Sequence, residues 1–193
     1  MIILNTKIHR KLMSLCLILI GGIMTLSLSG CRMQKNATGT ETNDVTSYDE
    51  LSEGDAAPDF TAELVDGSKF TLSENSGKVI LLNFWATWCG PCVEEMPAFT
   101  KLYQEYGNQV KILCINCVEP KDTVDDFVQK NSYTFPIAYD ENGTINRRYP
   151  TQGIPYTLVI GKDGTIRNIF LGSSGMEQQY QTYKDSIRAA LTK

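Results

Sequence analysis

The sequence predicts an α/β domain with a mixed central sheet and helices on both faces. An apolar run at 79–85 leads into a helical pattern, and a second apolar run follows at 110–118. Strand-like segments flank Asp-Gly turns at 66–67 and 163–164. In chain order this gives a hairpin, a β-α-β unit, a helix, a second hairpin and a last helix. Since β-α-β units pair strands in parallel and hairpins pair them antiparallel, the sheet must be mixed.

The chain begins with features of a secretory signal. Residues 1–11 hold three basic side chains, residues 12–28 hold no charge, and Leu-Ser-Gly-Cys ends at Cys31. A basic region, a short apolar core and small residues are typical of a cleaved signal peptide, here 1–30. An uncleaved membrane anchor stays open, although seventeen apolar residues are marginal for crossing a bilayer. Both interpretations place the rest of the chain outside the cytoplasm, at a membrane surface.

The rest of the chain divides into a tether and one domain. Without residues 1–30 the chain keeps 163 residues, and its net charge moves from −4 to about −7, which argues against nucleic-acid binding. Residues 31–52 are rich in Thr, Asn, Ser and Gly and predict a flexible tether. Residues 53–193 suit one compact domain, which we expect to act as a monomer.

The first elements of the domain are a hairpin and a buried strand. Segments 57–61 and 69–72 flank Val-Asp-Gly-Ser at 65–68, and Asp-Gly between strand-like runs indicates a β-hairpin. The run at 79–85 is apolar throughout except for one Asn, as in a strand covered on both faces.

A pair of cysteines lies where this strand turns into a helix. Cys89 and Cys92 are separated by Gly-Pro, and a helical pattern covers 93–103. This spacing brings both sulfurs into one helical turn, where they can close a small disulfide ring. Cys89 would take the helix N-terminus, where free N–H groups and the macrodipole favour a thiolate. Cys92 would resolve the mixed disulfide, and Trp88 would cover the site beside Cys89. The pattern predicts a redox-active dithiol.

A structural disulfide and half of a zinc site are the alternatives. The only histidine is His9, in the leader, so a zinc site would need cysteines or carboxylates alone. Cys114 and Cys117 repeat the spacing within a strand-like run, where residues three apart point to opposite faces and do not pair. We expect no metal or cofactor. Cys114 is predicted to be a buried apolar residue, and Cys117, nearer the active edge, stays open as a third redox thiol.

A helix and shorter elements follow the second strand. Residues 120–131 give an amphipathic pattern with Val124, Phe127 and Val128 facing inward. The remaining patterns predict a short strand at 135–138, a turn at 142–143 and a short helix at 145–149.

The end of the chain predicts a second hairpin and a helix. Segments 156–160 and 166–171 are strand-like and flank Lys-Asp-Gly-Thr at 162–165. Residues 176–191 form the last helix. Four of its side chains share one helical face and are expected to face the core: Tyr180, Tyr183, Ile187 and Leu191.

The active-site string carries a resemblance. Residues 88–92, Trp-Cys-Gly-Pro-Cys, resemble the thioredoxin active site letter for letter. The longer string at 88–97, Trp-Cys-x-Pro-Cys-x-x-Glu-x-Pro, is similar to extracytoplasmic thioredoxin-like proteins of the TlpA/ResA type. The resemblance covers 53–193 and implies a thioredoxin fold, a mixed sheet flanked by helices, with an added N-terminal β-hairpin.

The resemblance implies a substrate-binding loop at Ile154 and Pro155. In thioredoxin-like folds a cis-proline precedes a core strand and packs against the cysteine pair, and Ile-Pro before 156–160 resembles that element. The backbone beside such a proline can pair with an extended substrate segment. The alternative is a trans proline at a strand start.

Glu119 is a candidate for proton transfer. In ResA-like proteins a glutamate in this region lies near the active site and assists the resolving cysteine, and Glu119 matches it by order and spacing. A carboxylate at the carboxyl end of a parallel strand faces the same edge as the dithiol. The alternative is a solvated loop acid that caps the next helix.

The leader carries a second resemblance. Leu-Ser-Gly-Cys at 28–31 resembles the lipobox of bacterial lipoproteins, which implies a thioether lipid on Cys31 and cleavage before it.

These resemblances imply a membrane-anchored thiol-disulfide oxidoreductase. Its substrates would be disulfide-containing proteins such as apocytochrome c, methionine sulfoxide reductases or sporulation proteins, and its electron donor a CcdA-type or DsbD-like membrane protein. Gly-Pro between the cysteines favours a reductant over an oxidant or isomerase. A non-catalytic binding module also stays open.

A thiol peroxidase of the AhpC/TSA-like group is a further alternative, since peroxiredoxins share the N-terminal hairpin. Their motif, Pro-x-x-x-Thr/Ser-x-x-Cys, fails here, because Leu82 and Ala86 occupy the Pro and Thr positions.

Overall fold

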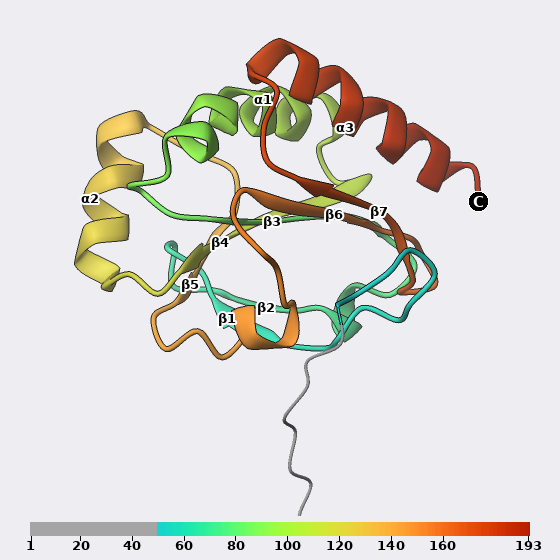
Figure 1. Cartoon of the computed structure of the whole chain (residues 1–193), viewed down its shortest axis with the longest axis horizontal. Helices are drawn as coiled ribbons and strands as arrows, with labels where there is room; N and C mark the ends of the chain where they lie inside the picture. Colours follow the sequence, from blue (N-terminus) through green and yellow to red (C-terminus); the bar gives the residue numbers. More distant parts are fainter. Residues whose placement is uncertain (1–49) are drawn as a thin grey trace, which may run out of the picture. The chain divides into compact units, whose positions relative to one another are not determined.

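The computed structural model describes residues 50–193, which form a five-stranded mixed sheet with a separate two-stranded hairpin (Figure 1). The order across the large sheet is β5-β4-β3-β6-β7. β3 pairs in parallel with β4, β4 pairs in parallel with β5, and β6 and β7 run antiparallel. The strands are β3 (Val79–Trp85), β4 (Val110–Cys117), β5 (Ile137–Asp140), β6 (Tyr156–Ile160) and β7 (Ile166–Leu171).

The central strand β3 organises the core. All seven of its residues are buried, and the apolar ones alternate between the two hydrophobic clusters on the two faces of the sheet. Val79, Leu81 and Trp85 face one cluster, whereas Ile80 and Leu82 face the other. A strand covered on both faces needs an apolar residue at nearly every position, which is why β3 shows no polar alternation.

The three α-helices lie on one face of the sheet, and the helices on the other face are only short 3₁₀ turns. Buried side chains of α1 (Gly90–Tyr106), α2 (Lys121–Asn131) and α3 (Met176–Leu191) all belong to the same hydrophobic cluster. The sheet order explains this arrangement. The crossovers β3-α1-β4 and β4-α2-β5 step in the same direction, and right-handed connections then place both helices on one face.

The N-terminal hairpin covers the other face (Figure 1). It consists of β1 (Thr61–Glu63) and β2 (Lys69–Thr71), which pair antiparallel around the predicted Asp-Gly turn. Two short 3₁₀ helices complete this side, η1 (Ser73–Asn75) and η2 (Asn146–Arg148). The hairpin extension is therefore present as predicted, and together with the 3₁₀ helices it covers this face of the sheet.

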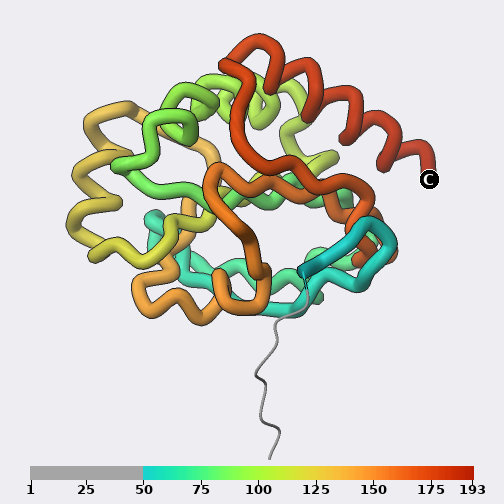
Figure 2. The backbone as a smooth tube through the Cα atoms, viewed as in Figure 1, coloured from blue at the N-terminus to red at the C-terminus, as the bar shows by residue number. Residues whose placement is uncertain are grey.

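The segment between η2 and β6 brings the chain back to the sheet. In Figure 2 the orange tube rises from the hairpin side to the start of β6. The Tyr149 hydroxyl donates a hydrogen bond of 2.6 Å to the Pro58 carbonyl, which fixes this segment to the chain before β1. The loop that precedes β6 is therefore anchored at Tyr149.

Several element boundaries differ from the prediction, among them the first hairpin strand, β1, which covers Thr61–Glu63 instead of 57–61. β5 covers Ile137–Asp140 instead of 135–138, because Pro136 cannot donate to the ladder and contributes only its carbonyl, which accepts from Cys114 N–H at 3.0 Å. The predicted short helix at 145–149 is the single 3₁₀ turn η2.

The predicted signal peptide, Cys31 and most of the tether lie outside the described residues. Within 50–193, none of the helices combines the length and the apolar character that a membrane crossing requires.

Candidate active site

The site is built around a disulfide between Cys89 and Cys92 at the start of α1. Cys89 is the N-cap residue, and its sulfur accepts a hydrogen bond from Cys92 N–H at 3.2 Å. Cys92 is fully buried, whereas Cys89 keeps 6% of its surface exposed. Only Cys89 is therefore presented to a partner, and Cys92 lies behind it.

The local sequence explains this placement. β3 ends at Trp85, and a turn follows in which Cys89 N–H donates to the Ala86 carbonyl at 3.2 Å. Pro91 lies in the first helical turn, where its missing N–H leaves no bond unmade. The first turn of α1 carries no acidic residue, so the positive end of the helix dipole remains available to a Cys89 thiolate.

The loop before β6 lies against the reactive sulfur. The Ile154–Pro155 peptide bond is cis, as predicted. The Ile154 carbonyl oxygen lies 3.8 Å from Cys89 Sγ. The Pro155 carbonyl accepts a hydrogen bond of 2.8 Å from Gly172 N–H, just after β7, which holds the loop in place. The predicted loop residues are therefore brought together with the cysteine pair.

An apolar rim surrounds this edge of the sheet. In the described part of the chain, the large hydrophobic side chains that stand exposed are Trp88 at 72%, Val118 at 62% and Leu171 at 58%. Trp88 follows β3 and Val118 follows β4, while Leu171 ends β7 opposite the start of β6. All three therefore lie at the edge of the sheet where the dithiol is placed.

Val118 has an unusual backbone conformation. Its φ is 58°, in the left-handed region that β-branched residues rarely adopt. Gly143 faces it, and a Cβ at that glycine would lie 3.3 Å from Val118 Cγ2. The turn ends β4 at Cys117, one residue earlier than predicted, and is followed by the inward-facing Glu119.

Glu119 is held at the active edge by three hydrogen bonds. Thr87 donates its backbone N–H to Oε2 at 2.7 Å and its hydroxyl to Oε1 at 2.5 Å, and Asn116 Nδ2 donates to Oε2 at 2.7 Å. Only 8% of Glu119 is exposed. Glu119 therefore contacts the turn that leads to Cys89, and its part in proton transfer stays a prediction. The alternative of a solvated capping acid is wrong, because the N-cap of α2 is Pro120, without a side-chain cap.

A second carboxyl group, Glu95, was not singled out from the sequence. It lies three residues after Cys92 on α1 and is fully buried. Burial raises the pKa of Glu95 to about 8, despite hydrogen bonds from Tyr183, Ser173 and Asn83 that act in the opposite direction. The available signal was the Glu of the Trp-Cys-x-Pro-Cys-x-x-Glu-x-Pro string, which the pattern places on the same helical turn as Cys92.

The two remaining cysteines of the described region are free and buried. Cys114 belongs to the cluster under the helices and Cys117 to the cluster under the hairpin, so they point to opposite faces, as predicted. Burial raises the pKa of Cys117 to about 12 and that of Cys114 well above its usual value. Both are protonated thiols at neutral pH, which disfavours a redox role for Cys117.

The zinc alternative finds no support in this arrangement. Within residues 50–193, His, Cys, Asp and Glu side chains form no group of three or more that could hold a metal ion. Cys89 and Cys92 are bonded to each other, and the second cysteine pair is divided between two faces of the sheet.

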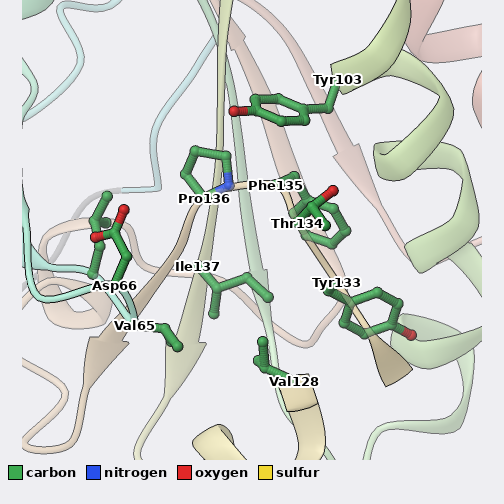
Figure 3. A pocket seen from close by; sticks show the side chains of 10 residues that line it. Val65, Asp66, Tyr103, Val128, Tyr133, Thr134, Phe135, Pro136 and Ile137 are labelled. Carbon is green, nitrogen blue, oxygen red and sulfur yellow. The ribbon is translucent and has the colours of Figure 1, made fainter. Parts of the chain in front are cut away.

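A pocket of about 190 Å³ lies away from this site (Figure 3). Tyr133 and Pro136, from the segment that enters β5, line it together with Tyr103 of α1. It therefore lies near the amino end of β5, whereas the dithiol lies at the carboxyl end of β3. This pocket is no part of the dithiol site.

The fold and the dithiol geometry together define a thiol-disulfide oxidoreductase of the thioredoxin fold. The model of the AhpC/TSA family matches residues 53–169, and the chain belongs to this family. The peroxidase alternative lies in the same family, so membership alone does not separate the two activities. The local sequence argues against a peroxidase, because the fully buried apolar residues Leu82 and Ala86 occupy the Pro and Thr positions of the peroxidase motif.

Named relatives identify the chain more narrowly as ResA-like. The thiol-disulfide oxidoreductase ResA of Geobacillus kaustophilus (strain HTA426) is 38% identical over 148 residues, covering 76% of this chain and 84% of the relative. The thioredoxin-like protein YneN of Bacillus subtilis (strain 168) is 37% identical over 134 residues, covering 68% and 78%.

Solved structures agree with this assignment. A thiol:disulfide interchange protein described as DsbE, from Chlorobium tepidum, superposes with a TM-score of 0.68 at 28% identity, covering 74% of this chain and 99% of that one. StoA from Bacillus subtilis gives a TM-score of 0.57 at 29% identity, covering 65% and 96%.

Proposed function

We propose that this protein is a lipid-anchored, extracytoplasmic reductase of protein disulfides, acting as a monomer through Cys89 and Cys92. The observation that carries the proposal is the asymmetry of the pair. Cys89 is the N-cap of α1 and reaches the surface, whereas Cys92 is fully buried behind it. An attacking thiol needs access and a resolving thiol needs protection, and the two cysteines differ in this way.

The reaction is thiol-disulfide exchange. The Cys89 thiolate attacks one sulfur of a substrate disulfide, that bond breaks, and the other substrate sulfur leaves as a thiolate that takes up a proton. Cys92 then loses its proton and attacks Cys89 Sγ, which forms the Cys89–Cys92 disulfide and releases the second substrate thiol. Two electrons pass from the dithiol to the substrate, and an external reductant must restore the pair.

The buried Cys92 needs a proton acceptor. We assign this role to Glu119, which stands at the active edge and accepts two hydrogen bonds from Thr87. Glu95 is the second candidate, because it shares the helical turn of Cys92 and, with a pKa near 8, can hold or release a proton close to neutral pH. Substitution of Glu119 and of Glu95, one at a time, shows which of the two carboxylates accepts the proton of Cys92.

The substrate segment is proposed to lie along Ile154 and Pro155, beside Trp88. The Ile154 carbonyl is close to Cys89 Sγ, and the exposed indole of Trp88 offers an apolar contact to the same segment. An extended peptide can pair with such a loop as an added strand. The fitting substrate is therefore a disulfide in a flexible or unfolded protein segment.

The reducing direction and the cellular setting rest on sequence arguments. Gly-Pro between the cysteines is the dipeptide of thioredoxin, whose potential lies near about −270 mV. A lipid on Cys31 would hold the domain beside a CcdA-type or DsbD-like membrane electron donor. Apocytochrome c, with its paired haem-binding cysteines, and oxidised repair enzymes are the proposed substrate classes.

The first experiment traps the intermediate in cells. Cys92→Ser should leave Cys89 bonded to its client, and the adduct should disappear on reduction. Cys117→Ser is the matched control, because it removes another buried thiol and should trap nothing. Absence of any Cys92→Ser adduct at native expression would remove the main support for exchange at this pair.

The second experiment decides the direction. The midpoint potential of the full-length protein should lie near or below about −250 mV in dithiothreitol buffers, with Trp88 fluorescence as the signal. A value above about −180 mV would instead indicate an oxidase or isomerase.

Family membership keeps a peroxidase as the second candidate function. In that reaction Cys89 attacks a hydroperoxide and Cys92 resolves the sulfenic acid. Turnover of hydrogen peroxide much faster than disulfide exchange would favour it. We expect the opposite order of rates.

A further inference from the structure

A closed ring of polar side chains is buried beneath α1 and α3. Asn83 Nδ2 donates to Glu95 Oε1 at 3.1 Å and to Thr157 Oγ1 at 2.9 Å. The Tyr183 hydroxyl lies 3.2 Å from Glu95 Oε2 and 3.0 Å from Thr157 Oγ1. All four side chains are fully buried. The carboxylate and the two hydroxyl groups find partners within the ring, whereas Asn83 Oδ1 has none among the described residues. An unpaired buried polar group is destabilising, so each hydrogen bond of the ring supports the core.

The sequence assembles the ring from four separate elements. Asn83 and Thr157 are paired residues on the neighbouring strands β3 and β6, while Glu95 comes from α1 and Tyr183 from α3. The ring of Tyr183 packs against Phe99 and Phe170, with centroids 5.5 and 5.4 Å away. This aromatic packing fixes the direction of the hydroxyl.

The hydroxyl of Tyr183 carries one hydrogen and cannot serve both neighbours at once. When Glu95 is ionised, Tyr183 donates to the carboxylate and can accept a hydrogen bond from Thr157. When Glu95 is protonated, its O–H can donate to the Tyr183 oxygen, and Tyr183 then donates to Thr157. The same heavy-atom positions therefore serve both protonation states through rotation of two hydroxyl groups.

We propose that Tyr183, supported by Thr157, is a positioning residue that lets Glu95 gain and lose a proton without rearrangement of the core. The inference rests on the proposed exchange function, in which a carboxyl group near Cys92 handles its proton. The last helix, α3, would then influence proton transfer at the cysteine pair, which lies at the start of α1.

Within residues 50–193, the pKa of Glu95 is shifted by its burial and its hydrogen bonds, without a charged neighbour. Other than the cysteine pair on its own helix, the titratable groups that face Glu95 are Tyr183 from α3 and Cys114 from β4, and burial keeps both protonated at neutral pH. Ser173, in the loop before α3, adds an uncharged hydrogen bond. The hydrogen bonds of Glu95, and not neighbouring charges, therefore determine how readily it binds a proton.

The direct test is a carboxyl ¹³C NMR titration of the full-length, glutamate-labelled, oxidised protein, with Glu95→Gln used to assign the signal. Tyr183→Phe removes the donor and keeps the aromatic packing. Because a hydrogen bond to an ionised group is the stronger kind, the pKa of Glu95 should rise by about one unit. An unchanged or lowered pKa of Glu95 would overturn the proposal.

Tyr180→Phe is the matched control, because Tyr180 lies one turn earlier on α3 and its hydroxyl bonds to the surface residue Glu105. It should leave the titration of Glu95 in place. If Tyr183→Phe does not fold, Thr157→Val takes its place. It removes the acceptor to which Tyr183 donates when Glu95 is protonated, so the pKa of Glu95 should fall. An unchanged or raised pKa in Thr157→Val would overturn the proposal.

A kinetic measurement separates this proposal from the exchange function. The rate at which Cys92 resolves a mixed disulfide with glutathione should show an inflection that Glu95→Gln removes and Tyr183→Phe moves to higher pH. If Glu95→Gln keeps the wild-type pH profile, the proton role of Glu95 fails. The NMR titration still decides whether Tyr183 positions Glu95.

Discussion

Thr87 donates two hydrogen bonds to Glu119, one from its backbone N–H and one from its hydroxyl, at 2.7 and 2.5 Å. This contact ties the turn that precedes Cys89 to the turn that follows β4. The dithiol is therefore positioned from two sides, by this clamp and by the Ile154 carbonyl on the opposite loop.

Replacement of Glu119 tests the clamp and the proposed proton transfer together. We expect Glu119→Gln to slow the Cys92 resolution step by about tenfold or more, because a carboxamide accepts no proton at neutral pH. The lifetime of a glutathione mixed disulfide on Cys89, followed by quenching and mass spectrometry, measures this step.

Glu141→Gln is the control, since this exposed carboxylate accepts a hydrogen bond from the Lys121 backbone N–H and none from the turn that leads to Cys89. Thr87→Val removes the hydroxyl that holds Glu119 but keeps the backbone donor and the carboxylate itself. It therefore shows how much of the effect comes from the position of Glu119 and how much from proton transfer. A wild-type lifetime in Glu119→Gln would exclude Glu119 as the acceptor.

Glu95 predicts a pH dependence of stability. Its pKa is about 8 in the folded protein and about 4.5 in the unfolded chain, so the folded state binds more protons between these values. Stability contributed by the neutral carboxyl is therefore present below about pH 4.5 and is lost as the pH rises toward 8. The total change is on the order of a few kcal/mol.

Urea unfolding at pH 5, 7 and 9 measures this dependence. In Glu95→Gln the free energy of unfolding should decline less between pH 5 and pH 9 than in the wild type. The variant should therefore compare more favourably with the wild type at pH 9 than at pH 5. Glu94→Gln, the neighbouring position on the outer side of α1, is the control. Equal slopes in wild type and Glu95→Gln would show that Glu95 is ionised throughout this range.

Cys117 should prove dispensable for catalysis. Its thiol is buried and its pKa is about 12, so it supplies almost no thiolate at neutral pH. We expect Cys117→Ala to keep the rate of insulin reduction within about twofold and to lower stability by about 1 kcal/mol through a small cavity. A loss comparable to that of Cys92→Ser would identify Cys117 as a third redox thiol.

The sequence predicted the elements whose signals are local. The strand, the Cys-x-x-Cys turn and the helix are contiguous, and the cis-proline loop is a short string before a clear strand, so each could be recognised without tertiary contacts. The common face of the three helices could not, because it depends on the order β5-β4-β3, which no local pattern contains.

The buried carboxyl was missed for a similar reason. A helical Glu is normally solvated, and only the packing of α3 over α1 covers Glu95 with Tyr183 and encloses it. The start of β5 also depends on its neighbour, since the register Cys114↔Ile137 decides which residues pair.

Val118 offers a test of substrate recognition that leaves the dithiol untouched. Val118→Asn replaces an exposed apolar side chain by a polar one that tolerates a φ of 58° better, so the fold should be at least as stable. We expect the KM for a protein disulfide to rise by about threefold to tenfold, since one apolar contact is worth about 1 kcal/mol. The rate with the small disulfide 5,5′-dithiobis(2-nitrobenzoate) and the reduction potential should stay unchanged, because neither involves contact between Val118 and a protein substrate. If Val118→Asn slows both substrates equally, the strained turn acts by positioning Glu119, and the apolar rim has no part in binding.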